Sequence, residues 1–201
     1  MERGQTKREI LNAALEMFSV QGFEATSMAQ IAEAVGIRKA SLYSHFESKQ
    51  SILEALVQEV LHQYAAHSIF GQAAGDVPDT PLTPDDAVTM IEEQVRYILH
   101  DPNISRARKM LVIEQFRNPE LAALQTKQNY TDVMRYFTSL VKALIAQGVL
   151  AQDDAELMAA QLCLPISVWI NLCDREPARE QEIMALMERH IRQFFRRYQA
   201  N

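Results

Sequence analysis

The chain has 201 residues and a formal net charge of −6, and 48% of its residues are hydrophobic. This composition supplies enough apolar material for a buried core and argues against a disordered chain and against a general polyanion binder, which would be more basic. Seven prolines and six glycines are few for a turn-rich β-protein, and no segment alternates apolar and polar residues as a strand does. The sequence therefore predicts an all-α protein.

Start and stop signals predict three short helices and a fourth, longer one in the N-terminal part of the chain. Two pairs have the form of a capping box, in which a hydroxyl and a Glu or Gln three residues later cap a helix: Thr6 with Glu9, and Ser27 with Gln30. Gly22 and Gly36 follow these two helices and are typical of helix C-termini. The predicted ranges are 6–22, 27–36, 39–46 and a helix that begins at Ser48.

Residues 71–84 contain two glycines and three prolines without apolar periodicity, so they are expected to form a loop. Further helices are expected over about 83–100, 104–116, 119–148, 153–173 and 178–198, which makes about nine in all. The apolar stretch Leu157–Cys173 has no charged residue, but its polar residues and its length favour a buried helix over a membrane span. Cys163 and Cys173 lie too far apart on that helix to pair and are interpreted as reduced core thiols.

Residues 27–46 have the layout of a helix-turn-helix, in which two short helices join at a tight turn that contains Gly36. An apolar set is expected to hold these helices against the first helix: Ile31, Ala32, Val35, Ile37, Leu42 and Phe46. The side chains left outside on the second helix are small or polar, which suits approach to base edges in a major groove. We therefore expect Lys39, Ala40 and Ser41 to lie near bases.

Nine residues are candidates for contact with duplex DNA: Ser27, Arg38, Lys39, Ala40, Ser41, Tyr43, Ser44, His45 and Lys49. The side chains of Tyr43, Ser44, His45 and Lys49 can bond phosphates, and the helix N-terminus at Ser27 offers backbone N–H groups to another.

Local charge favours this surface although the chain as a whole is acidic. Between Ala34 and Phe46 there are two cations and no acid, and residues 1–50 hold six cations and six acids. The remaining 14 cations and 20 acids account for the whole net charge, so repulsion would orient the neutral part toward DNA. Alternatives remain open: Arg38 and Lys39 as a solvated pair, and His45 as a partly buried histidine.

Nineteen residues between positions 10 and 53 form a pattern that includes the run GIRKASLYSHFESKQSIL: Ile10, Ala13, Ala14, Phe18, Gly22, Phe23, Thr26, Ser27, Ile31, Ala32, Val35, Gly36, Ser41, Leu42, Tyr43, His45, Phe46, Lys49 and Leu53. Through them residues 6–56 resemble the DNA-binding domain of the TetR family of bacterial transcriptional regulators, with a departure at Ser44–His45. The resemblance implies a cytoplasmic homodimer with a helix-turn-helix domain at 1–48 and a helical ligand-binding and dimerisation domain at 49–201. Such proteins usually repress until a small-molecule effector releases them from a double-stranded DNA operator.

The helices after the loop are expected to enclose an effector pocket. Candidate pocket residues are Tyr97, Met110, Gln115, Phe116, Tyr130, Met134, Gln161, Trp169 and Asn171, each of which can equally be plain core. Pro165 cannot donate an N–H to the carbonyl of Gln161, which would leave a polar atom inside the domain. The last two helices are the expected dimer surface, with Met184, Met187, Ile191 and Phe194 or Phe195 on one face.

An enzyme is not expected, because the sequence has no phosphate loop, nucleophile elbow or histidine pair at metal-ligand spacing. No catalytic residue, metal or cofactor is therefore predicted. A purely structural helical dimer would leave the Lys39–Lys49 surface unexplained. A regulator of the same fold that responds to a protein partner, or that activates transcription, remains the alternative.

Overall fold

A computed structural model describes residues 3–70 and 82–200. These residues form ten α-helices, one π-helical segment and one 3₁₀ turn, and the only strand-like pairing in the described ranges is a single β-bridge between Leu150 and Gln199. The predicted all-α fold is thereby confirmed. The extra helix in the count arises because the helix expected over 119–148 is interrupted by the π-helical segment.

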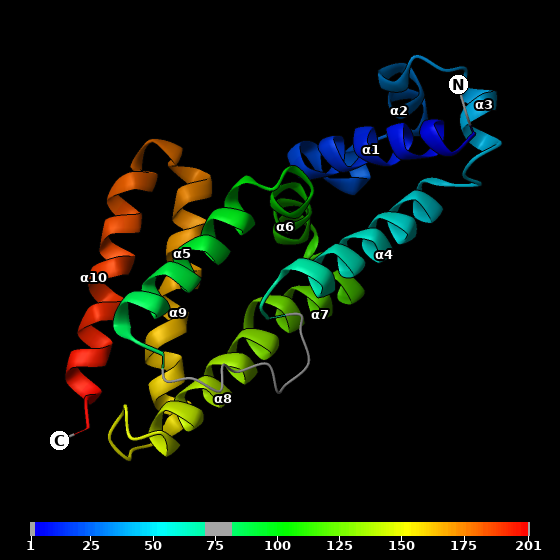
Figure 1. The fold of residues 1–201 in the computed structure, drawn as a ribbon. Coiled ribbons are helices and arrows are strands. Elements are labelled where there is room, and N and C mark those ends of the chain that lie inside the picture. The colour runs from blue at the N-terminus through cyan, green and yellow to red at the C-terminus, as the bar shows by residue number, and fades with distance from the viewer. Residues whose placement is uncertain (1–2, 71–81, 201) are drawn as a thin grey trace. The chain divides into compact units, whose positions relative to one another are not determined.

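The helices are α1 (Arg3–Ala25), α2 (Met28–Val35), α3 (Lys39–Tyr43), α4 (Lys49–His67), α5 (Pro84–His100), α6 (Pro102–Glu114), α7 (Pro119–Thr126), α8 (Asp132–Ala146), α9 (Ala155–Arg175) and α10 (Glu180–Tyr198). The π-helical segment η1 (Lys127–Thr131) joins α7 to α8, and the 3₁₀ turn η2 (Pro177–Arg179) precedes α10. Figure 1 shows their order along the chain.

The helices fall into two compact units, which are described separately. Unit 1 comprises Met1–His67 and Asp101–Gln125, and unit 2 comprises Ser68–His100 and Thr126–Asn201. Unit 1 therefore joins α4, α6 and α7 to the three N-terminal helices. The functional boundary expected between residues 48 and 49 stays a prediction. Of the expected loop 71–84, residues 71–81 lie outside the described part of the chain.

Unit 1 is built around α1, which packs along α6 and against α2 and α4 (Figure 1). Its core contains side chains that are entirely buried, among them Ile10, Phe18, Ile31, Leu42 and Ile52. Burying one such side chain contributes about 1.5–3 kcal/mol relative to leaving it exposed. The apolar periodicity of the four N-terminal helices thus predicted the core of this unit.

The first helix breaks at Gly22, where the backbone has φ 84° and ψ 167°. The break ends the regular helix at the predicted residue and frees the N–H of Phe23, which donates to Glu114 Oε1 at 2.8 Å. The carboxylate of Glu114 is buried at 2% exposure, so this bond ties the end of α6 to the break in α1. The predicted start was wrong: α1 begins at Arg3, and Thr6 lies inside it instead of capping it.

In unit 2, α9 packs on α8 and α10, and α5 packs on α9 and α10 (Figure 1). The face of α10 formed by Met184, Met187, Ile191, Phe194 and Phe195 is buried within this chain's own core. The expectation that this face forms the dimer surface was therefore wrong. An apolar helix face alone does not reveal whether its partner is the same chain or another copy.

Pro165 lies inside α9, as expected from the sequence. Side chains of α10 form hydrogen bonds with residues of α9 close to this proline. His190 Nε2 of α10 lies 3.0 Å from the carbonyl oxygen of Leu162, and the hydroxyl of Tyr198 donates to Gln161 Oε1 at 2.6 Å. These contacts fix α10 on α9. They involve Leu162 and the side chain of Gln161, not the main-chain carbonyl of Gln161 that Pro165 leaves without its helical donor.

Two features of α9 bear on earlier expectations. The helix is long and apolar enough to cross a membrane, but this is weak evidence because core helices of soluble proteins pass the same test. Cys163 and Cys173 are 2% and 4% exposed and form no disulfide. Burial raises the pKa of the Cys163 thiol to about 11.

The break at Gly22 gives a stability prediction. Substitution Gly22→Ala forces a side chain into a left-handed conformation and places its Cβ 2.9 Å from Glu114 Oε1. We expect the free energy of unfolding to fall by about 2 kcal/mol, measured by urea denaturation with far-UV circular dichroism.

Gly4→Ala is the matched control, because Gly4 also lies in α1 and its Cβ would meet nothing within 4 Å. Equal effects of the two substitutions would contradict the structural role given to Gly22.

Candidate nucleic-acid interface

Helices α2 and α3 form the expected helix-turn-helix, and local sequence signals fix its geometry. Ser27 and Gln30 form the predicted capping box: Ser27 N–H donates to Gln30 Oε1 at 2.8 Å, and Gln30 N–H donates to Ser27 Oγ at 3.3 Å. Gly36 ends α2 in a left-handed conformation with φ 73°, which only glycine adopts without strain. The chain can therefore turn within three residues and start α3 at Lys39.

The buried face of α3 determines which side chains point outward. Leu42 and Phe46 are 0% and 5% exposed and belong to the core of unit 1. Regular helix ends at Tyr43, earlier than the predicted 46, and the chain continues in turns that bring Phe46 into the core. The side chains of Arg38 to Ser41 and of Tyr43 and Ser44 therefore lie on the solvent side.

Six of the nine candidate contact residues are exposed on and beside α3, and together they are called the α3 ridge. Its members are Arg38, Lys39, Ala40, Ser41, Tyr43 and Ser44, all classed as exposed, with Tyr43 at 45%. Lys39 Nζ lies 5.9 Å from the centre of the Tyr43 ring, and Ser44 Oγ donates to the Ser41 carbonyl at 2.7 Å. The middle of the ridge thus carries the small side chains of Ala40 and Ser41. Cations precede them in the chain, and the hydroxyls of Tyr43 and Ser44 follow.

The side chains of two further candidates, His45 and Ser27, are less available for contact with DNA than those of the ridge. His45 is partly buried, which matches the alternative left open for it. Ser27 is exposed, but its side chain is occupied in the capping box. Close by, Lys7 of α1 lies 5.4 Å from the centre of the Phe46 ring, which adds a cation beside the ridge.

Lys49 has a contact set that the sequence did not predict. Its ammonium donates to the carbonyl oxygens of Phe23, Glu24 and Thr26 at 2.5, 3.3 and 2.8 Å, and it lies 4.2 Å from the centre of the Phe23 ring. These carbonyls end α1 and lead into α2. Lys49 is the first residue of α4, so these bonds join the start of α4 to the chain segment that precedes the helix-turn-helix. Backbone acceptors carry no residue signature, so no sequence signal could have indicated this clamp.

The nine candidate pocket residues are not brought together in one unit. Met110, Gln115 and Phe116 belong to unit 1, where Met110 is buried in the core and Phe116 is 89% exposed. The other six belong to unit 2, namely Tyr97, Tyr130, Met134, Gln161, Trp169 and Asn171. Within unit 2, Met134 contacts Cys163, and Trp169 makes an edge contact with His190. Their role in effector binding stays a prediction.

The N-terminal and C-terminal parts of the chain each match a model of one protein family. Residues 10–56 match the domain of bacterial regulatory proteins of the tetR family, and residues 86–200 match the C-terminal domain of AefR-like transcriptional repressors. The first match spans the helix-turn-helix and Lys49, and the second covers more than half of the chain.

Individual proteins agree with these matches. The transcriptional regulator UidR of Escherichia coli K12 is 26% identical over 167 residues, which is 83% of this chain and 80% of UidR. A TetR-family regulator from Mesorhizobium loti has a TM-score of 0.70 at 19% identity, with full coverage of both chains. SmeT, repressor of a Stenotrophomonas maltophilia efflux pump, in complex with triclosan has a TM-score of 0.67 at 19% identity, covering 98% of this chain and 93% of SmeT.

The helix-turn-helix, its exposed ridge and both domain matches lead to the same classification. The chain belongs to the TetR family of bacterial transcriptional regulators.

Proposed function

We propose that the protein is a cytoplasmic, dimeric repressor that binds a duplex operator through the α3 ridge and leaves it when a small molecule binds unit 2. The observation that carries the proposal is the placement of Leu42 and Phe46 in the core, which turns Lys39, Ser41 and Tyr43 outward. A small, cationic helix surface of this kind suits the major groove.

The ridge divides by chemistry into two sets of contacts. Lys39, Ala40 and Ser41 are assigned to base edges, because Ala40 and Ser41 are small enough to let the helix approach and Lys39 can reach a guanine. Tyr43, Ser44 and His45 are assigned to phosphates, with Arg38 and the helix N-terminus at Ser27 at the flanks. The clamp of Lys49 points to a positioning role for that residue, in addition to the phosphate contact expected from the sequence.

Dimerisation through α9 and α10 is proposed on the surface that remains after the chain's own core is formed. Leu157 and Val168, eleven residues or three turns apart on α9, are 57% and 62% exposed. Between them lies the half-buried Leu164. A second copy on this face would form a four-helix bundle. A two-fold dimer of helix-turn-helix domains reads half-sites about one DNA turn, roughly 34 Å, apart.

Effector control is proposed by analogy with a solved structure of similar fold. The bound triclosan in the SmeT complex supports a small molecule as the releasing agent, and the six candidate residues of unit 2 are its proposed contacts. The alternative is control by a protein partner, or an activator of the same fold. Release of operator by a metabolite fraction freed of protein would favour the first version. Release only by a protein fraction would favour the second.

The proposed function can be tested without knowing the operator. Purified protein is mixed with sheared genomic DNA of its source, and the retained fragments are sequenced. One shared, inverted-repeat sequence is expected, since a two-fold dimer reads two half-sites. Retention of unrelated fragments in proportion to their length would contradict a specific operator binder.

Removing cations and hydroxyls from the ridge should weaken operator binding without unfolding the protein. Lys39→Ala is expected to lower operator affinity about tenfold. Tyr43→Phe is expected to lower it by a smaller factor, because it removes only the tyrosine hydroxyl that is assigned to a phosphate. Lys39→Ala should also relax the preference for operator over unrelated DNA, because Lys39 is assigned to a base edge; fluorescence anisotropy with both duplexes measures this preference.

Lys142→Ala is the control, because Lys142 is an exposed cation on α8 in unit 2. An equal loss of affinity in the control, or a large drop in melting temperature for Lys39→Ala, would argue against the ridge.

Lys49→Met separates a clamp from a phosphate contact. Loss of a charged donor to three carbonyls should lower the free energy of unfolding by about 1–2 kcal/mol, measured by urea denaturation. Lys142→Met serves as the matched exposed lysine. Unchanged stability together with weakened operator binding would mean that Lys49 acts on phosphate alone.

The double substitution Leu157→Glu and Val168→Glu should convert the dimer to a monomer, because it places charges in the apolar centre of the proposed interface. Size-exclusion chromatography with light scattering reports the mass. Val20→Glu is the control, because Val20 is 78% exposed on α1 in unit 1. A dimer that persists in the double variant would place the interface elsewhere.

A further inference from the structure

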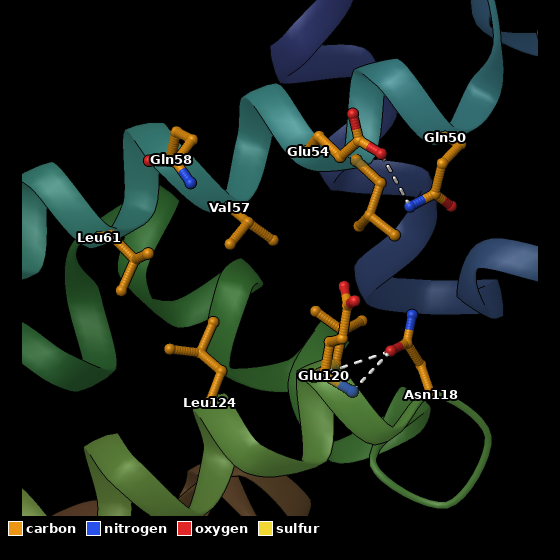
Figure 2. Close-up of a pocket in the computed structure, with 10 residues that line it drawn as sticks. Gln50, Glu54, Val57, Gln58, Leu61, Asn118, Glu120 and Leu124 are labelled. Atoms are coloured by element: carbon orange, nitrogen blue, oxygen red, sulfur yellow. Dashed lines mark hydrogen bonds between the residues drawn. The ribbon is translucent and has the colours of Figure 1, made fainter.

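The π-helical segment η1 lies close to the point at which the chain passes from unit 1 to unit 2. The helix before it, α7, is bound into unit 1: Asn118 accepts the N–H groups of Glu120 and Leu121 at 3.0 and 3.2 Å, and Leu124 extends toward α4 (Figure 2). Leu121 is 4% exposed in the core of unit 1, whereas the buried face of α8 belongs to the core of unit 2. A change of winding in η1 would therefore change the register between two helices that pack in different cores.

Asp132, the first residue of α8, is bonded to Lys127 through both its main chain and its side chain. Its N–H donates to the carbonyl oxygen of Lys127, which is the five-residue bond of a π-helix. Its carboxylate oxygen Oδ2 accepts from the Lys127 ammonium at 2.6 Å. In a regular α-helix, two residues five apart lie about 140° apart around the axis and do not face each other. The side-chain pair therefore fits the π winding and not the α winding.

The burial of Asp132 makes the choice of its partners important. Its side chain is 1% exposed, whereas that of Lys127 is 58% exposed. A second cation, Arg135, lies 3.0 Å from Oδ1 in an ion pair that lacks hydrogen-bond geometry. A buried carboxylate that loses a charged partner is strongly destabilised, because water cannot replace that partner. The carboxylate therefore favours the winding that brings Lys127 to it.

We propose that the Lys127–Asp132 pair is a register lock, which holds η1 in the π winding of the operator-binding form. The structure that presents the α3 ridge outward has this winding. An event in unit 2 that draws the carboxylate away from Lys127 lets η1 rewind to α-helix and leaves Arg135 as the partner of Asp132.

The consequence of rewinding follows from helix geometry. Loss of the π turn rotates α7 relative to α8 by about 100° and moves it by about 1.5 Å along the axis, which is the contribution of one residue. Packed cores do not deform continuously, so a step of this size displaces the helices as bodies. This inference rests on the proposed function, in which unit 2 receives the signal and unit 1 binds the operator.

The lock is tested by removing the partners of the pair one at a time. Lys127→Met and Asp132→Asn break the five-residue pair and should shift η1 toward the α winding. Through-hydrogen-bond NMR couplings report the winding, because the Asp132 N–H donates to the carbonyl of Lys127 in the π turn and to that of Gln128 in an α turn. The spectra are recorded on the full-length protein without DNA, so they do not depend on the operator.

Two substitutions are matched controls. Arg135→Met removes the other cation of Asp132, but Arg135 lies three residues later within α8, so its loss should leave the winding of η1 unchanged. Lys127→Arg keeps the cation and should also keep the π turn. Operator affinity should fall about tenfold in Lys127→Met and Asp132→Asn and stay within about twofold in both controls, because only the fraction of protein in the competent winding binds tightly.

The inference is overturned if the Asp132 N–H remains bonded to the carbonyl of Lys127 in both Lys127→Met and Asp132→Asn. A changed winding with unchanged operator affinity overturns it as well, as does an equal loss of affinity in Arg135→Met. If the unsubstituted protein retains no specific operator, the proposed function fails, and the NMR couplings still decide whether the pair sets the winding. Melting temperatures are measured alongside, and Lys127→Met tests the lock even if Asp132→Asn does not fold.

Discussion

The break in α1 at Gly22 is the constraint on which the geometry of unit 1 depends. At that residue the backbone leaves the helical conformation, which exposes an N–H on one side and carbonyls on the other. The buried carboxylate of Glu114 accepts the N–H, and the ammonium of Lys49 holds the carbonyls. A glycine is needed because any side chain there would meet Glu114, so one residue permits both connections.

These two connections join three helices at the entrance to the helix-turn-helix. Glu114 is the last residue of α6 and Lys49 is the first residue of α4, so a displacement of either helix bears on the segment that leads into α2. The α3 ridge is anchored by Leu42 and Phe46, which are buried in the core of unit 1. The segment that leads into α2 is held by these polar contacts. The position of the α3 ridge therefore depends on contacts within unit 1, made by Leu42, Phe46, Glu114 and Lys49.

Local signals predicted the fold well and long-range polar contacts poorly. The Ser27–Gln30 capping box, the left-handed Gly36 and the apolar spacing of Ile31, Leu42 and Phe46 depend on neighbours in sequence, so they could be read directly. The partners of Lys49 are main-chain carbonyls more than twenty residues away, which leave no trace in a sequence. The sequence predicted the apolar face of α10 correctly. We expected this face to pack against a second copy, whereas it packs into the chain's own core. Pocket residues were chosen by type alone, and type does not distinguish a cavity wall from a packed interior.

The burial of Cys163 restricts the chemistry open to its thiol. A thiol with a pKa of about 11 keeps roughly one part in ten thousand as thiolate at pH 7, and the thiolate is the form that peroxides and electrophiles attack. Because the side chain is also 2% exposed, reagents have little access to the sulfur. Cys163 is therefore unsuited to act as an oxidation sensor.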